Sequence, residues 1–225
     1  MCWMKTPVLV LPLAFGLVCG CSSQSARFGG YVGYEHREFK SVEHEHVTHP
    51  DDRAFLLGSP GTTGVASGEF ARLGVRLASR DQLMEHLELK ADVGMLAGGA
   101  RDEKQNENDP RPADQGSFIY SELYPVAPEV AVGARYFVAP KLALGLDLNW
   151  AHLFVEHGWD RFGDDEKTDT DGVSAVSLGP TVAYSFGSVE CELGAGFPVA
   201  GDGGWMIHLT ITLPFWTSEK SEDGE

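Results

Sequence analysis

The feature that most constrains the fold is an alternation of apolar and polar residues that recurs in eight stretches between about Phe28 and Trp216. A period of two indicates β-strands, because successive side chains of a strand point to opposite faces. The links between the stretches alternate between short and long. The pattern predicts an all-β fold, an eight-stranded antiparallel up-and-down barrel with its long loops at one end. The short links are Arg80–Gln82, Val138–Lys141 and Phe186–Ser188, and the long ones are Ser41–Gly68, Gly99–Gly116, Glu156–Asp171 and, less long, Ala200–Gly204.

The two faces of these strands indicate which side of the barrel is inside. The less apolar face is rich in Gly, Ala, Ser and Thr, and small side chains fit the narrow interior of an eight-stranded barrel. Aromatic residues mark both ends of the apolar face, with Trp150 and Trp205 toward the long loops and Tyr136 and Phe215 toward the short turns. Aromatic rings favour the two membrane–water interfaces. The pattern therefore predicts a transmembrane barrel with its apolar face outward.

Charged residues of both signs lie on the predicted inner face. Buried charges persist only when they are paired or hydrated, so we expect an ion network across the lumen that leaves no open pore, with the arginines bridging carboxylates of neighbouring strands. The predicted members are Arg72, Arg76, Glu88, Lys90, Asp92, Glu129, Arg135, Asp147, Glu190 and Glu192.

The strand rhythm, the loop asymmetry and two strand phrases, Val132–Phe137 and Leu142–Asp147, resemble the small outer-membrane β-barrel family of opacity-like and OmpX-like proteins. The resemblance implies a bacterial outer-membrane location, short periplasmic turns, long extracellular loops, and both termini in the periplasm. It also implies contact with outer-membrane lipid and lipopolysaccharide, and binding of a cell-surface ligand through the loops. One departure is the acidic tail, Thr217–Glu225, which follows the last aromatic residue of the barrel.

The N-terminus has the features of a secretory signal: Lys5, then the apolar stretch Pro7–Val18. The segment ends Val-Cys-Gly-Cys-Ser, which resembles the lipobox of bacterial lipoproteins, with Cys21 as the lipidated residue; ordinary signal cleavage nearby is the alternative. This predicts a signal peptide over residues 1–20, a lipidated linker over 21–27, the barrel over 28–216 and an acidic periplasmic tail over 217–225. Cys191 would remain as a small packing residue on the apolar face.

Composition narrows the possible partners. The formal net charge is −16, which argues against nucleic acid, because a phosphate backbone needs a surface rich in Lys and Arg. The chain has no run of about 20 apolar residues, so no transmembrane helix is expected.

Two loops carry residues that could bind metal ions. Neutral imidazoles at close spacing are ligands for zinc, copper or nickel, and the first loop contains His44, His46 and His49. The third loop, Asp160–Asp171, is dense in carboxylates that could bind calcium or magnesium. For both loops a solvated polar segment is the favoured interpretation, and metal binding is the alternative.

These observations favour a non-enzymatic barrel without a cofactor, acting in envelope structure or in surface interaction through its loops. One alternative is a lipid-anchored, lipocalin-like soluble barrel that binds a small apolar ligand. Another is an enzyme that modifies lipid A, for which His152, Glu156 and His157 lie near a loop rim. Such an enzyme also needs a nucleophile, and no serine near this segment stands out.

Overall fold

The computed structural model describes residues 23–46, 61–81, 86–105, 117–161 and 164–219. All regular secondary structure in these ranges is β-strand. The strands are β1 Ser23–His46, β2 Gly61–Asp81, β3 Leu87–Gly99, β4 Arg101–Gln105, β5 Ser117–Leu123, β6 Val126–Ala139, β7 Leu142–Arg161, β8 Asp164–Phe186, β9 Val189–Gly201 and β10 Gly203–Glu219.

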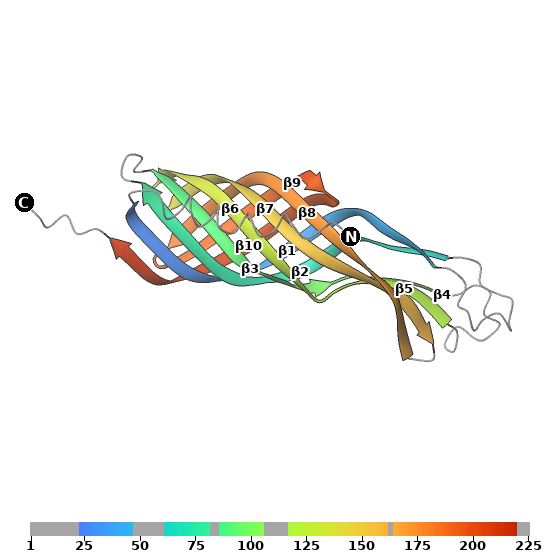
Figure 1. Cartoon of the computed structure of the whole chain (residues 1–225). Helices are drawn as coiled ribbons and strands as arrows, with labels where there is room; N and C mark the ends of the chain where they lie inside the picture. Colours follow the sequence, from blue (N-terminus) through green and yellow to red (C-terminus); the bar gives the residue numbers. More distant parts are fainter. Residues whose placement is uncertain (1–22, 47–60, 82–85, 106–116, 162–163, 220–225) are drawn as a thin grey trace, which may run out of the picture.

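Eight of these strands close into a ring (Figure 1), which confirms the predicted antiparallel barrel. The order around the ring is β7-β6-β3-β2-β1-β10-β9-β8, and β8 pairs again with β7. Every pairing is antiparallel, including the one between the first and last strands, β1 and β10. The short strands β4 and β5 continue the lines of β3 and β6 beyond the ring, where β5 pairs with the far part of β7. The ring therefore has eight strands, although the described residues form ten.

The alternation of β7 shows which face is inside. Leu144, Leu146 and Leu148 are 48%, 52% and 41% exposed on the outer surface, whereas Asp147 between them is 1% exposed. The predicted orientation of the strand is confirmed. The lipocalin-like alternative is wrong, because it needs these leucines inside the barrel.

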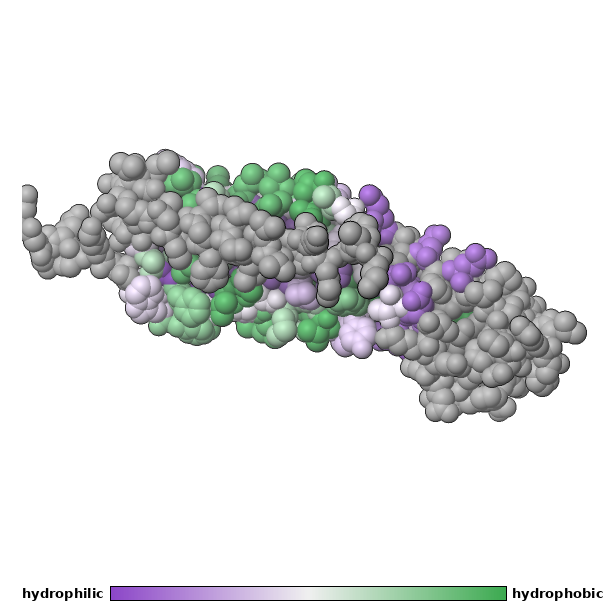
Figure 2. All heavy atoms as spheres, viewed as in Figure 1, coloured by the Kyte–Doolittle hydropathy of each residue, from purple (hydrophilic) through white to green (hydrophobic). Residues whose placement is uncertain are grey.

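Exposed apolar side chains surround the ring. All eight ring strands contribute to this belt, and Figure 2 shows hydrophobic residues along the barrel and hydrophilic ones where the strands project beyond it. Soluble proteins rarely expose continuous apolar patches larger than a few hundred Å². Representative members, in ring order, are Leu146, Tyr136, Met95, Leu73, Val32, Leu209, Leu193 and Val182.

The long connections contain strand where the sequence analysis expected loops. β1 continues to His46 and returns as β2 from Gly61, and we call residues 40–46 with 61–68 the first arm. β7 continues to Arg161 and returns as β8 from Asp164; together with β4 and β5, residues 152–161 and 164–172 form the second arm. Pairing also extends past both predicted barrel boundaries, since Ser25 lies opposite Glu219.

An apolar core fills the inside of the barrel toward the arms. It is made by buried side chains of seven strands, and Leu96, Leu153 and Val155 in it are fully inaccessible. This core was not predicted, because the sequence pattern indicated small and charged residues inside the barrel. The other members are Phe39, Val65, Phe70, Leu123, Ala127, Ala151 and Val173.

In the part of the chain that the structure describes, no helix is long and apolar enough to cross a bilayer.

Candidate functional site

The lumen of the ring holds Asp, Glu, Lys and Arg side chains from six of its eight strands. Each of the ten residues predicted to face inward is between 1% and 6% exposed. Tyr31, Glu35, Arg37 and His208 lie there as well, and sequence reasoning missed them as members of the network. The alternation of β1 from Gly29 to Phe39 could have identified the first three, but a register shift at Phe28/Gly29 makes the start of that strand irregular.

Arg76 is the centre of the network. Its guanidinium forms two hydrogen bonds with Asp92 on the adjacent β3, Nε to Oδ1 at 2.7 Å and Nη2 to Oδ2 at 2.8 Å. It also donates to Glu190 at 3.1 Å and to Glu192 at 2.8 Å. Both glutamates belong to β9, which does not neighbour β2 in the ring. One side chain therefore connects opposite walls of the barrel.

Lys90 and Arg135 form further links across the lumen. The Lys90 ammonium lies 2.6 Å from Glu192 and 2.5 Å from Asp147. Arg135 donates to Glu88 and to Glu190, each at 2.5 Å. The predicted network across the lumen is therefore present, and it combines ion pairs between neighbouring strands with pairs between strands that are not neighbours.

A second layer of the network lies nearer the apolar core. Arg72 Nε is 3.1 Å from Glu129 Oε2, and the Tyr31 hydroxyl donates to Glu129 Oε1 at 2.7 Å. Arg37 Nε donates to Glu35 at 2.6 Å. Buried ion pairs are tolerated only when hydrogen bonds compensate for lost hydration, and these contacts provide that compensation from one wall to the other.

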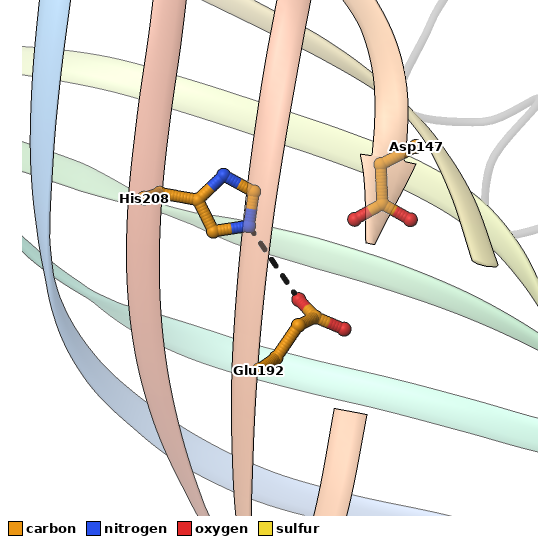
Figure 3. Close-up of side chains that lie close together, drawn as sticks. All are labelled: Asp147, Glu192 and His208. Atoms are coloured by element: carbon orange, nitrogen blue, oxygen red, sulfur yellow. Dashed lines mark ion pairs between the residues drawn. The ribbon is translucent and has the colours of Figure 1, made fainter. Parts of the chain in front are cut away.

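Asp147, Glu192 and His208 are the one group among the described residues whose spacing suits a metal ion. One ligand atom from each lies within 4.8 Å of the others, and Figure 3 shows the imidazole and the two carboxylates converging from three strands. The position beside the two carboxylates already belongs to Lys90, whose ammonium lies within 2.6 Å of both. Glu192 also accepts from Arg76. A divalent ion would face two fixed cations here, so the geometry favours an ion-pair network over a metal site.

The structure describes the histidine-rich segment only in part, and it does not describe the lipidation residue. His44 and His46 belong to the first arm, and only their backbone is described; His49 and Cys21 lie outside the described residues. The metal and lipidation assignments stay predictions.

His152 and His157, which the enzyme alternative groups together, point to opposite faces of β7. His152 lies on the outer face between the rings of Trp150 and Phe154, and its Nδ1 is 2.8 Å from Ser174 Oγ. His157 is fully buried, and its Nδ1 is 2.7 Å from Ser121 Oγ. The structure therefore does not bring the two histidines into one site.

The arms are held together by side chains as well as by the apolar core. Asp102 of β4 accepts a hydrogen bond of 2.9 Å from the backbone N–H of Gly64 on β2. Asp102→Ala should therefore destabilise the contact between the arms by about 1 kcal/mol. Hydrogen exchange at the Gly64 amide should become about fivefold faster, and Asp102→Asn, which keeps an acceptor oxygen, is the control. Unchanged exchange in Asp102→Ala would show that this bond does not hold the arms together.

Comparison with known proteins finds similar structures but no similar sequence. No protein-family model matches the chain, and no curated protein sequence matches it. Ail, the attachment invasion locus protein of Yersinia pestis, in complex with the heparin analogue sucrose octasulfate, is 8% identical; the match covers 87% of this chain and 99% of that one, with a TM-score of 0.46. Neisserial surface protein A is 12% identical over 85% of this chain and 99% of its own, with a TM-score of 0.36. The eight-stranded assignment rests on the strand pairing described above.

Proposed function

We propose that the protein is a non-enzymatic barrel of the bacterial outer membrane, with a closed lumen and with two arms that make contacts at the cell surface. The observation that carries this proposal is the inversion of an ordinary protein interior. The belt of the ring is apolar on the outside, while the lumen inside the belt is charged and hydrogen-bonded. Such an arrangement is stable where hydrocarbon surrounds the barrel.

The dimensions of the belt support a membrane-spanning role. Trp205 and Phe215 lie ten residues apart on the outer face of β10, and both are exposed. Ten residues of strand rise about 33 Å, and a tilt of about 40° reduces this to roughly 25 Å along the barrel axis. That is about the height of the apolar band in outer-membrane barrels.

Contacts across the lumen support the closed state. Arg76, Lys90 and Arg135 each reach carboxylates on the opposite wall. A pocket at the turn end, bounded by Arg27, Arg135 and Glu190 among others, has a volume of about 30 Å³, enough for about two water molecules. The apolar core toward the arms supports closure at the other end of the lumen.

In this proposal the arms project to the cell exterior and both termini lie on the periplasmic side. β1 starts and β10 ends at the turn end of the barrel, where Ser25 pairs with Glu219. Outer-membrane barrels have short turns toward the periplasm and long connections toward the exterior. Lipopolysaccharide would then surround the outer part of the belt.

Two measurements on the refolded protein test this proposal. In detergent or lipid vesicles it should resist SDS until boiled and then change its mobility on the gel, because a closed membrane barrel unfolds only on heating. In planar bilayers it should insert without stepwise conductance. A protein that stays monomeric in buffer without detergent would refute the membrane location, and steady channels would refute the closed lumen alone.

A further inference from the structure

The wall of the barrel is incomplete between the two arms. β9 ends at Gly201 and β10 begins at Gly203, while β8 and β1 on either side continue past this turn into the arms (Figure 1). The last pairs of the wall are Ala175↔Gly201 and Phe39↔Gly203. Beyond them, the edges of β8 and β1 that face each other across the turn have no strand partner among the residues that the structure describes.

Asp202 forms the floor of this opening. Its backbone N–H donates to the Ser174 carbonyl at 2.9 Å, and its carbonyl accepts from the Lys40 N–H at 2.8 Å. These two bonds end the continuous hydrogen bonding of the wall. Any strand that extended the sheet would begin directly beyond this turn.

The backbone of β8 presents hydrogen-bonding groups on the open side. In a strand, every second residue directs its N–H and C=O to the same neighbour. Since the Ser174 carbonyl faces Asp202, the groups of Gly172 and Thr170 face the same way. The Thr170 N–H already donates to the Asp169 carboxylate at 2.8 Å. Gly172, which is exposed, presents both its N–H and its C=O, as an edge strand does before a further strand is added.

The charges on both sides of the opening are mainly negative, although the exposed Lys40 lies at the turn itself. Five carboxylates and one lysine lie between Asp164 and Gly172, and residues 41–46 of β1 carry Glu43 and Glu45 without any Lys or Arg. Asp169, Asp171, Glu43 and Glu45 are exposed. A segment that entered between these edges would need positive side chains to compensate.

The outer edge of β4, on the other side of the second arm, differs from the β8 edge in its hydrogen bonding and in its charge. β4 pairs on one side with β5, and on its other side Asp102 binds the Gly64 amide of β2. Its charges are already paired locally, since Arg101 contacts both Glu103 and Glu122. The open edge of β8 is therefore the better site for a partner.

We propose that the β8 edge binds an extended, lysine- or arginine-rich segment of a partner protein by β-strand addition, beginning at Gly172 and continuing toward Asp164. Main-chain hydrogen bonds would supply affinity, and the acidic side chains would select the charge. This inference rests on the proposed function, which places the arms outside the membrane, and it identifies the kind of partner that they contact.

The test uses the full chain in zwitterionic detergent and a fluorescent ten-residue peptide in which lysine alternates with threonine and valine, measured by anisotropy. Gly172→Pro removes the N–H on the open edge, and Pro is tolerated on the free side of an edge strand. Gly172→Ala is the matched control, because it adds the same Cβ, 3.2 Å from the His152 ring, and keeps the N–H. The peptide should bind Gly172→Pro about tenfold more weakly than Gly172→Ala.

Two further comparisons separate strand addition from general charge attraction. A peptide with glutamate in place of lysine should not bind, and the double variant Asp169→Asn, Asp171→Asn should bind the lysine peptide about fivefold more weakly at low salt. Equal affinity of the Pro and Ala variants, or no binding to the unmodified chain at 1 mM peptide, would overturn the inference. The mobility shift on boiling, measured on the same samples, reports on the membrane barrel independently of either result.

Discussion

Arg76→Met is expected to reduce the free energy of unfolding by about 3–5 kcal/mol, the cost of leaving buried charges without their partner. Arg76 is 3% exposed and pairs with three carboxylates, Asp92, Glu190 and Glu192. Met has a similar length and no charge, so in the variant Asp92 loses the guanidinium that binds it, while Glu190 and Glu192 keep their contacts with Arg135 and Lys90. Urea unfolding in phosphatidylcholine vesicles, followed by tryptophan fluorescence and by the mobility shift on boiling, measures the loss.

The neighbouring residue provides the control for this variant. Val75 is 42% exposed on the outer face of the same strand, so Val75→Ala should cost less than about 1 kcal/mol. Arg76→Lys should be intermediate, because an ammonium keeps the charge but cannot form the paired hydrogen bonds to Asp92. If Arg76→Met unfolds at the same urea concentration as Val75→Ala, the ion pairs contribute nothing to stability and the lumen is hydrated.

Leu146→Arg is expected to cost about 2–4 kcal/mol in a bilayer, the penalty for a cation on the lipid face near the membrane midplane. Leu146 is 52% exposed on the outer surface, near the middle of the belt. On a water-soluble barrel the same substitution at an exposed position would change stability by less than about 0.5 kcal/mol. The variant therefore tests the environment of the belt directly, by urea unfolding in vesicles.

A second arginine variant, placed near the turn end, shows how the cost depends on depth in the membrane. Val138 is 50% exposed beside the turn between β6 and β7, so Val138→Arg should cost about 0–1 kcal/mol, as expected near a membrane interface. A dependence on depth, with the larger loss at position 146, supports the membrane location. Equal losses at positions 138 and 146 would contradict it.

The alternation of the strands was sufficient to predict the barrel and the direction of the side chains in seven of its strands; the facing of the first strand, about Phe28–Lys40, was left open. Leu144 and Asp147 could be placed on opposite faces because a period of two leaves only two choices, and the small residues of one face decided between them. The partners of each charge were harder to predict. Arg76 reaches β9 across the lumen, and such a contact depends on the width of the barrel and on the relative height of the strands, which a pattern along one strand does not report.

The arms were missed because the pattern of polarity changes where the strands leave the belt. In β2, Phe70 and Arg72 face inward, but so do Thr63 and Val65, which have the opposite parity. The pairing of β1 with β2 shifts register between Glu38 and Val42. Past this shift the buried face combines apolar side chains such as Val65 with polar ones such as Thr63, and exposed residues such as Glu43 and Glu45 are polar. The alternation followed along the sequence therefore breaks off where the strands leave the belt, and the arm residues beyond it were assigned to loops.

The connections across the lumen also constrain how the chain can assemble. The carboxylates that neutralise Arg76 on the far wall lie 114 and 116 residues later in the sequence. A hairpin containing β2 that entered the bilayer alone would carry unneutralised charge into hydrocarbon, at a cost of several kcal/mol. Stepwise insertion of successive hairpins is therefore disfavoured. The strands should instead curl together at the membrane surface and cross it as one unit, with the meeting of the first and last strands completing the process.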